Sequence, residues 1–334
     1  MASKINSLFI LLTILTTASA TIGLLLEWSD YKRTYGRNYN IFEDVYRKTI
    51  FLSNVNQIKL HNLRFSRGCE TYDLGINQFT DMTYAEFAKI FQESSTLLPE
   101  GSPYPPKGLC NNVKDNATPW RNFDWRVLGG DTPVKDQGIT CNTGWAFAAL
   151  SALEGRTFAV TQSLPQSLSA QNLIDCIFPQ TCTSKTPIDA YNYIIREQNV
   201  NTEIWYPYVG KPGSCKYLST NLGATCANYA TELGGENEIG ILVLTTGPIA
   251  FEFDPLSFSF MHYKSGVFRT PAIVKPSTGR HYMSIIGFGS DAQGGNYWLA
   301  KNSFGTTWGE SGYIRIASND RNGGIKSPSY PIVF

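Results

Sequence analysis

The stretch QGITCNTGWAF, residues 137–147, places a cysteine shortly before an aromatic-rich helix start. At a helix N-terminus, backbone N–H groups and a nearby imidazolium lower the pKa of a thiol. Thiolate chemistry also needs a histidine within reach and hydrogen-bond donors for an oxyanion. Cys141 stands four residues before Trp145, and the residue directly before that tryptophan is Gly144. The stretch therefore contains either a nucleophile at Cys141 or a disulfide partner beside a position that lacks one.

The composition argues against several other kinds of chemistry. The only histidines are His61, His262 and His281, and no two cysteines have C-x-x-C spacing, so we expect no metal and no cofactor. Lysine and arginine total 28 against 27 acidic residues, which gives no basic excess for nucleic acid or a membrane surface. The sequence also lacks the G-x-S-x-G elbow of serine hydrolases.

The N-terminus has the features of a secretory signal peptide over residues 1–20. Lys4 precedes an apolar run from Leu8 to Leu15, and the small residues Ala18-Ser19-Ala20 follow it. This run is far shorter than the roughly 20 apolar residues that a membrane span needs. We therefore expect a soluble protein that is secreted or lies in the endolysosomal lumen, with disulfides among its seven cysteines and an N-glycan acceptor at Asn116.

Helical patterns dominate the first part of the chain and strand patterns the last. Six residues with helical spacing share one face of a predicted N-terminal helix: Glu43, Arg47, Phe51, Asn54, Ile58 and Asn62. A segment rich in proline, glycine and serine, 98–108, predicts an exposed linker. Further helices are expected over 145–160, 168–175 and 187–198, and strands from about 240 onward. This order indicates an α+β fold with two subdomains.

Two motifs of the N-terminal part resemble the propeptide of a papain-family cysteine protease. The six-residue helix face matches the propeptide helix signature of that family at every position. A second motif, G-x-N-x-F-x-D, is formed by Gly75, Asn77, Phe79 and Asp81. The resemblance covers about residues 27–334 and implies a cathepsin L-like propeptide over 21–106 and a papain-like mature domain over 107–334. It also implies a helical left subdomain, a β-barrel-like right subdomain and a substrate cleft between them.

Four segments of the C-terminal part resemble the mature enzyme of the same family. PVKDQG resembles the segment of the oxyanion-hole glutamine, here Gln137, and WAF resembles the start of the central helix at Trp145. RHYMSIIGFG resembles the strand of the catalytic histidine, here His281. YWLAKNSFGTTWGESGY resembles the asparagine region, which implies roles in the site for Asn302 and Trp308.

The nucleophile position departs from the family pattern. In the papain family the nucleophilic cysteine directly precedes the helix tryptophan, and a structural cysteine stands three residues before the nucleophile. By that alignment Gly144 occupies the nucleophile position and Cys141 the structural one. Three residues is almost a full helical turn, and a misplacement of about 1 Å can cost on the order of a hundredfold in rate. Thr143 offers only a hydroxyl, a weaker nucleophile than a thiolate.

The resemblance also implies a set of disulfides: Cys141–Cys182, Cys176–Cys215 and Cys110–Cys226. These bridges use every cysteine of the mature part, whereas a free Cys141 would leave Cys182 as an orphan thiol in an oxidising compartment. Cys69 would then stay unpaired in a removable propeptide. The pairing of Cys110 with Cys226 resembles the group-one allergens of mites, which are papain-family proteases.

Other positions of the expected cleft also depart from the family pattern. Ser184 and Lys185 stand where two glycines usually let a substrate backbone approach, so side chains are expected to crowd the cleft. Phe304 replaces the tryptophan that shields the histidine–asparagine bond, a mild change. One additional residue, Ile139 or Thr140, is expected to shift the oxyanion glutamine.

The leading hypothesis is a secreted papain-like protein without proteolytic activity, which binds peptides, protease inhibitors or host proteins. A second hypothesis is an active endopeptidase that uses a rearranged Cys141. A third is a regulator whose propeptide inhibits active relatives, because the propeptide motifs are intact while the nucleophile position is not. A fourth is a storage or structural protein that retains only the fold. The oligomeric state is left open.

Overall fold

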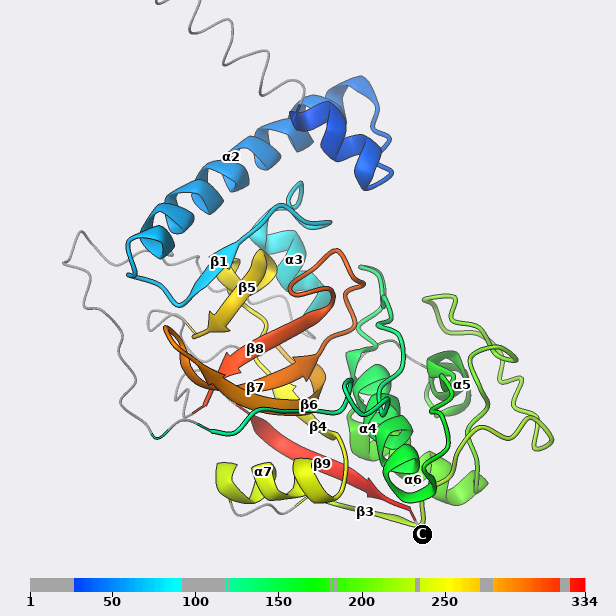
Figure 1. Cartoon of the computed structure of the whole chain (residues 1–334). Coiled ribbons are helices and arrows are strands. Elements are labelled where there is room, and N and C mark those ends of the chain that lie inside the picture. The colour runs from blue at the N-terminus through cyan, green and yellow to red at the C-terminus, as the bar shows by residue number, and fades with distance from the viewer. Residues whose placement is uncertain are drawn as a thin grey trace, which may run out of the picture.

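The structure is a computed structural model that describes residues 27–91, 118, 120–180, 182, 185–231, 235–270, 279–318 and 325–333. An N-terminal region, residues 27–91, lies against one edge of the main body, which begins at residue 118 (Figure 1). The predicted signal peptide, the linker, Cys110, Asn116 and Ser184 fall outside the described residues. Within them, no helix is long and apolar enough to cross a membrane.

The N-terminal region consists of three helical segments and one strand. After a helix over 27–34 it contains α2 (Ile41–Ser66), β1 (Tyr72–Leu74) and α3 (Tyr84–Phe91). Asn40 caps α2 by accepting hydrogen bonds from the N–H groups of Phe42 and Glu43, which explains why the helix begins just before the predicted position 43.

The main body combines a helical cluster with a large sheet. Its elements follow in the order β2 (Phe123–Asp124), α4 (Gly144–Thr161), α5 (Ala170–Cys176), α6 (Pro187–Glu197), β3 (Asn228–Ala230), α7 (Glu236–Thr245), β4 (Ile249–Phe253), α8 (Phe258–Met261), β5 (Tyr263–Phe268), β6 (His281–Asp291), β7 (Gly295–Lys301), β8 (Tyr313–Ala317) and β9 (Lys326–Ile332). Helices α4, α5 and α6 lie together beside the sheet (Figure 1). The predicted α+β fold and the three predicted helices are confirmed.

One nine-stranded sheet joins the two regions of the chain. Its strand order is β1-β5-β8-β7-β6-β4-β9-β3, and β2 pairs with β6. Strand β1 of the N-terminal region is antiparallel to β5, with Tyr72 opposite Gly266. Strand β6 is almost entirely buried, because its sequence HYMSIIGFGSD packs apolar side chains against both α4 and the core of the sheet. The N-terminal region is thus an edge of the same sheet that carries residue 281.

The signature face of α2 holds the returning chain of the N-terminal region. The side-chain amide of Asn54 donates to the carbonyl oxygens of Thr80 and Met82, both at 2.9 Å. Farther along the helix, Asn62 exchanges two hydrogen bonds with the backbone of Leu74. Arg47 pairs with Glu86 of α3 at 2.8 Å. The polar residues of this face therefore replace water for backbone groups that would otherwise be buried without partners.

The disulfide pattern confirms two predicted bridges and corrects the third. Cys141 is bridged to Cys182, and Cys176 to Cys215. Cys226 is instead a free buried thiol, whose sulfur lies 4.0 Å from the carbonyl oxygen of Tyr191 and whose pKa burial raises to about 12. The predicted Cys110–Cys226 bridge is therefore wrong, and the likeness to mite allergens loses the spacing that distinguished it.

The error in the predicted pairing came from the assumption that Cys69 is unpaired. It is disulfide-bonded in the structure, although the sequence argument treated it as unpaired. That argument balanced the cysteines of the mature part alone, whereas pairing depends on which sulfur atoms come within bonding distance in the folded chain.

Replacing Asn54 by alanine is expected to lower the free energy of unfolding by about 1–3 kcal/mol, because two buried carbonyls lose their donor. The matched control is Asn56→Ala, since Asn56 is exposed on the same helix two residues away. Urea unfolding followed by tryptophan fluorescence measures both variants. Equal midpoints for the two variants would contradict the assigned role of Asn54.

Candidate functional site at the start of helix α4

Helix α4 begins at Gly144, the residue that the sequence places at the nucleophile position. The chain entering this helix is fixed by the disulfide at Cys141 and by the hydroxyl of Thr143, which lies 2.8 Å from the phenolic oxygen of Tyr208. The Tyr208 hydroxyl in turn donates to the backbone oxygen of Gln137 at 2.8 Å. These bonds hold the first turn of α4 beside residue 137.

His281 is the first residue of β6, and its side chain is fully buried. Its Nε2 lies 2.7 Å from Oδ1 of Asn302, which can only accept, so Nε2 carries the proton. The other ring nitrogen, Nδ1, has no hydrogen-bond partner among the described residues. Burial lowers the pKa of His281 to about 4, although the bond to Asn302 acts in the opposite direction. The ring is therefore uncharged at neutral pH.

The ring of His281 lies directly against the backbone of Gly144. A Cβ atom added to Gly144 would stand 2.7 Å from both Nδ1 and Cε1 of this ring. Carbon and nitrogen atoms that are not bonded to each other do not approach this closely without displacement. The imidazole thus fills the space into which a side chain at residue 144 would point.

Gln137 also lies beside Gly144. Its Oε1 accepts a hydrogen bond from the Ser303 hydroxyl at 2.7 Å and would lie 3.2 Å from a Cβ on Gly144. Its Nε2 is buried and has no partner among the described residues. Ile139 and Thr140 are exposed, so the additional residue projects outward and leaves Gln137 beside Gly144. The Gln137 atom nearest to that position is the acceptor Oε1 and not the donor Nε2, and the expected shift of Gln137 out of oxyanion geometry stays a prediction.

Aromatic rings cover the bond between His281 and Asn302. The ring of Phe304 stacks on the imidazole with 4.8 Å between centroids and 23° between planes. Trp308 packs edge-on against Phe304 at 5.4 Å and donates its indole N–H to the carbonyl oxygen of Phe260 at 3.0 Å. Phe304 therefore shields the histidine, as the resemblance implies for the residue at this position.

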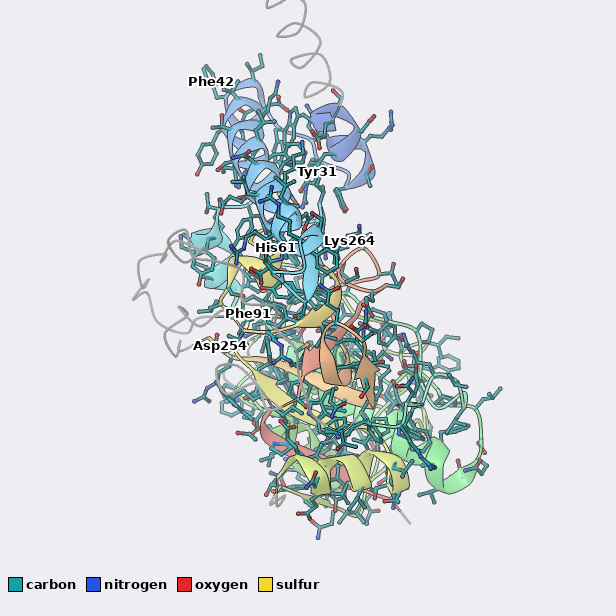
Figure 2. The ribbon with its side chains drawn as sticks, turned by 60° about the vertical axis from the view of Figure 1, so that its left-hand side comes forward. Tyr31, Phe42, His61, Phe91, Asp254 and Lys264 are labelled. Atoms are coloured by element: carbon teal, nitrogen blue, oxygen red, sulfur yellow. A yellow bond between two sulfur atoms is a disulfide. The ribbon has the colours of Figure 1, made fainter. Side chains whose placement is uncertain are left out.

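The N-terminal region seals the site from outside. Phe91, at the end of α3, packs edge-on against His281 at 5.3 Å, and Figure 2 shows it at the junction with the main body. Phe79 and Phe87 pack edge-on against Phe304 at 5.3 and 6.5 Å. No sequence argument selected Phe91. The available signal was its position one helical turn after Phe87, on the same face of α3.

Two other residues predicted for the cleft, Trp145 and Lys185, are buried. Trp145 is buried in the helical cluster of α4, α5 and α6, with only 2% of its surface exposed. Lys185 precedes α6 and is buried as well. Sequence reasoning missed Ser303 and Tyr208, which bond to the side chain and backbone of Gln137. Ser303 directly follows Asn302 in the chain, and that adjacency was the available signal.

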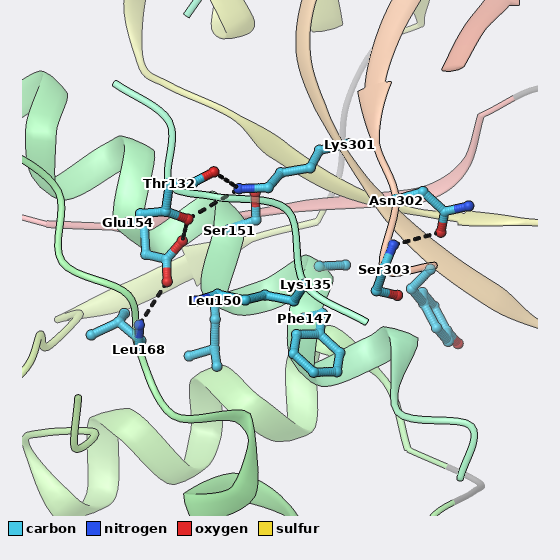
Figure 3. A pocket seen from close by; sticks show the side chains of 12 residues that line it. Thr132, Lys135, Phe147, Leu150, Ser151, Glu154, Leu168, Lys301, Asn302 and Ser303 are labelled. Atoms are coloured by element: carbon cyan, nitrogen blue, oxygen red, sulfur yellow. Dashed lines mark hydrogen bonds between the residues drawn. The ribbon is translucent and has the colours of Figure 1, made fainter. Parts of the chain in front are cut away.

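A small polar cavity lies behind the site, between α4 and the sheet (Figure 3). Its volume is about 20 Å³, enough for one water molecule. Glu154 accepts hydrogen bonds there from the Thr132 hydroxyl at 2.5 Å and from the N–H of Leu168 at 2.7 Å. Lys301 donates to the carbonyl oxygen of Thr132 at 2.6 Å and pairs with Asp131 at 2.7 Å. This network joins the two halves of the main body and is too small to hold a substrate.

Comparisons with known proteins match the two regions separately. Residues 120–332 match the papain family cysteine proteases, and residues 28–87 match the cathepsin propeptide inhibitor domain. The chain belongs to the papain family. It is 37% identical to digestive cysteine proteinase 2 of Homarus americanus, with 92% of this chain and 94% of that protein aligned. It is 34% identical to cathepsin J of Mus musculus, with 92% of each aligned.

A solved structure supports the same assignment. Digestive procathepsin L 3 of the Tenebrio molitor larval midgut superposes with a TM-score of 0.78 at 31% identity, covering 93% of this chain and 99% of that one. The α+β architecture and the N-terminal helical region are therefore those of a papain-family precursor, and residues 28–87 form its propeptide domain. Within this papain-family framework, His281 and Gln137 lie beside a glycine, and Asn302 bonds to the histidine.

Replacing Gly144 by alanine is expected to lower the free energy of unfolding by about 1–3 kcal/mol, because the new methyl group must displace the buried ring of His281. Gly240→Ala in α7 is the matched control, since a Cβ there would make one ordinary contact, at 3.6 Å from Trp298. That control is expected to be neutral or stabilising by up to about 1 kcal/mol. Calorimetric unfolding of both variants decides whether the two glycines differ in this way.

The stability of the protein is expected to fall as the pH is lowered from about 6.5 towards 4. The unfolded chain takes up a proton on His281 near pH 6.5, whereas burial holds the folded pKa at about 4. The stabilisation is thus fully present above pH 6.5 and decreases by about 1.4 kcal/mol per pH unit in this window. His262, whose pKa burial lowers to about 3, contributes in the same direction.

Urea unfolding between pH 4 and 8 measures this dependence. His281→Gln removes one titrating group and is expected to reduce the slope below pH 6.5 while leaving the slope above it unchanged. An identical slope in the variant and the parent protein would show that His281 is not the group responsible.

Proposed function

We propose that this protein is a proteolytically inactive member of the papain family that acts by binding polypeptides. The observation that carries the proposal is the contact between His281 and Gly144, because the imidazole occupies the space that a nucleophilic side chain would need. Loss of the nucleophile alone costs on the order of a millionfold in a serine protease, about as much as loss of the whole catalytic group. Retained partners therefore do not restore turnover.

Neither neighbouring side chain offers a substitute nucleophile. The sulfur of Cys141 is bonded to Cys182, and the residue is 1% exposed. The Thr143 hydroxyl is buried and hydrogen-bonded to Tyr208, and the described residues place no base beside it. A rearranged Cys141 would require both reduction of its disulfide and a shift of almost one helical turn. These contacts argue against the active-enzyme hypothesis.

The contacts of the protein around the site favour peptides and proteins as its ligands. Its own N-terminal region already lies there as a polypeptide, with Gln78 donating to the carbonyl oxygen of Phe304 at 2.5 Å and Tyr84 to that of Leu256 at 3.1 Å. Backbone oxygens and aromatic rings are the groups that recognise an incoming peptide chain. We place this activity outside the cell or in the endolysosomal lumen, with protease inhibitors or host proteins as candidate ligands.

A second candidate function is inhibition of active papain-family proteases by the N-terminal region. It is favoured by the match of residues 28–87 to the inhibitor domain and by a separate hydrophobic core of Trp28, Tyr31, Phe51 and Val55. On this hypothesis a fragment of residues 21–106 inhibits an active relative at nanomolar concentration. Absence of inhibition by a folded fragment would exclude it.

An epoxide probe for reactive cysteines, combined with a fluorogenic peptide assay, tests the main proposal after removal of the N-terminal region. The unaltered protein is expected to show neither labelling nor turnover. Removal of the N-terminal region takes Phe91 off the His281 ring, so that the ring has room to move aside for a side chain at residue 144. Gly144→Cys is therefore expected to be labelled, because a thiol at the start of a helix has a lowered pKa. Gly144→Ala is the matched control and is expected to stay unlabelled. Labelling of Cys141 together with turnover in the unaltered protein would overturn the proposal.

A further inference from the structure

Helix α2 has a second face, opposite the face that holds the returning chain of the N-terminal region. The buried residues Phe51, Asn54 and Ile58 lie on the inner face. Alternating steps of four and three residues place seven exposed residues along the outer face, which we call the outer stripe: Phe42, Tyr46, Thr49, Ser53, Asn56, Leu60 and Leu63. These steps average 3.5 residues, the repeat with which one helix packs along another.

Large apolar side chains occupy both ends of the outer stripe. Phe42 and Tyr46 lie in the first half of α2, and Leu60 and Leu63 in the second, and all four are between 48% and 88% exposed. Figure 2 shows Phe42 at the end of the helix farthest from the main body. A single exposed apolar residue is ordinary, but a row of them on a helix that is apolar on its inner face as well indicates a surface that another element covers.

The middle of the outer stripe contains only Thr49, Ser53 and Asn56. Their short side chains let a second helix approach closely, and their hydroxyl and amide groups can exchange hydrogen bonds across the contact. Ser53 is seven residues from Tyr46 on one side and seven from Leu60 on the other. Two such stripes in antiparallel orientation therefore place the aromatic end of each against the leucine end of the other.

We propose that two copies of this protein associate through their outer stripes, with the two α2 helices antiparallel and crossing at Ser53. The contact is the same on both copies, so it closes on itself as a twofold dimer. The proposal concerns assembly alone and does not depend on the proposed function.

The charges of α2 favour a second copy in this orientation. The first turn of the helix contains Glu43 and Asp44, and the last turn contains Arg64. The antiparallel arrangement places Glu43 of one copy beside Arg64 of the other, and both side chains are partly exposed. Antiparallel helices also bring opposite ends of their macrodipoles together.

A parallel pair lacks these advantages. It would place the acidic first turns of the two copies next to each other. The main body lies toward the His61 end of α2 (Figure 2), so parallel helices would also bring the two main bodies together. In the antiparallel pair the main bodies lie at opposite ends.

The dimer is expected to be reversible. The contact consists of one pair of helices, which is a limited interface for a stable complex. On one flank Lys48 of each copy approaches Lys59 of the other, and Glu27, at 3.8 Å from Lys59, offsets part of this repulsion.

Assembly through the outer stripe depends on the N-terminal region and leaves the candidate site unchanged. The stripe lies wholly on α2, whereas Phe91 of α3 contacts His281 in the direction of the main body. The same molecule is therefore expected to be a dimer while it carries the N-terminal region and to lose this contact when the region is removed.

Sedimentation velocity of the protein with its N-terminal region intact measures the association over a range of concentrations. The parent protein is expected to change from monomer to dimer as its concentration rises. Tyr46→Glu is expected to raise the dissociation constant by about tenfold or more, because each copy then places a carboxylate against the leucine end of the other. Leu164→Glu is the matched control, since Leu164 is 84% exposed on the main body, and it is expected to leave the dimer unchanged.

Cysteine cross-linking tests the orientation of the two helices. A mixture of Tyr46→Cys and Leu60→Cys is expected to form a disulfide-linked dimer under mild oxidation, whereas neither variant alone is expected to do so. A parent protein that stays monomeric, a dimer that Tyr46→Glu does not weaken, or self-linking of either cysteine variant would each overturn the proposal. None of these readouts measures ligand binding or proteolysis, so failure of the dimer and failure of the proposed function are distinguishable.

Discussion

The packing of the candidate site depends on the burial of one uncharged imidazole, that of His281. The Nε2–H of His281 donates a hydrogen bond to Oδ1 of Asn302 at 2.7 Å. The unprotonated Nδ1 faces the backbone of Gly144. A charged ring would lose its hydration there without a compensating carboxylate among the described residues, so the folded state favours the neutral form. A thiolate–imidazolium pair needs the opposite condition, in which each charge stabilises the other. With glycine at residue 144, the site is packed in the manner of a core.

The N-terminal region is a structural part of this core. Phe91 packs against His281, and Phe79 packs against the ring of Phe304 that stacks on the same imidazole. Because β1 also adds a strand to the sheet, the region contributes both backbone hydrogen bonds and aromatic burial to the main body. Its departure would expose several large aromatic rings at once, a cost that scales with the apolar area returned to water.

Residues that lie in motifs of fixed local spacing were predictable from the sequence. Gly144 was located by counting back from Trp145 in the papain-family pattern, and helical spacing placed the six signature residues on one face of α2. The contact between His281 and Gly144 could not be predicted in this way, because it depends on a ring position set by residues far apart in the chain. The pairing of Cys69 escaped prediction for a related reason. Counting cysteines gives parity, whereas pairing depends on three-dimensional proximity.

His281, Asn302 and Gln137 have a structural role that does not depend on catalysis. Oδ1 of Asn302 accepts hydrogen bonds from the ring N–H of His281 and the backbone N–H of Ser303. The Ser303 hydroxyl donates to Oε1 of Gln137. Removing any member of this buried chain leaves its neighbour with an unpaired polar group, which costs about 1–3 kcal/mol. These hydrogen bonds therefore contribute to stability whatever the activity of the protein. The presence of histidine, asparagine and glutamine at these positions does not by itself indicate proteolytic activity. The identity of residue 144 is the more direct indicator, because that position would have to supply the nucleophile.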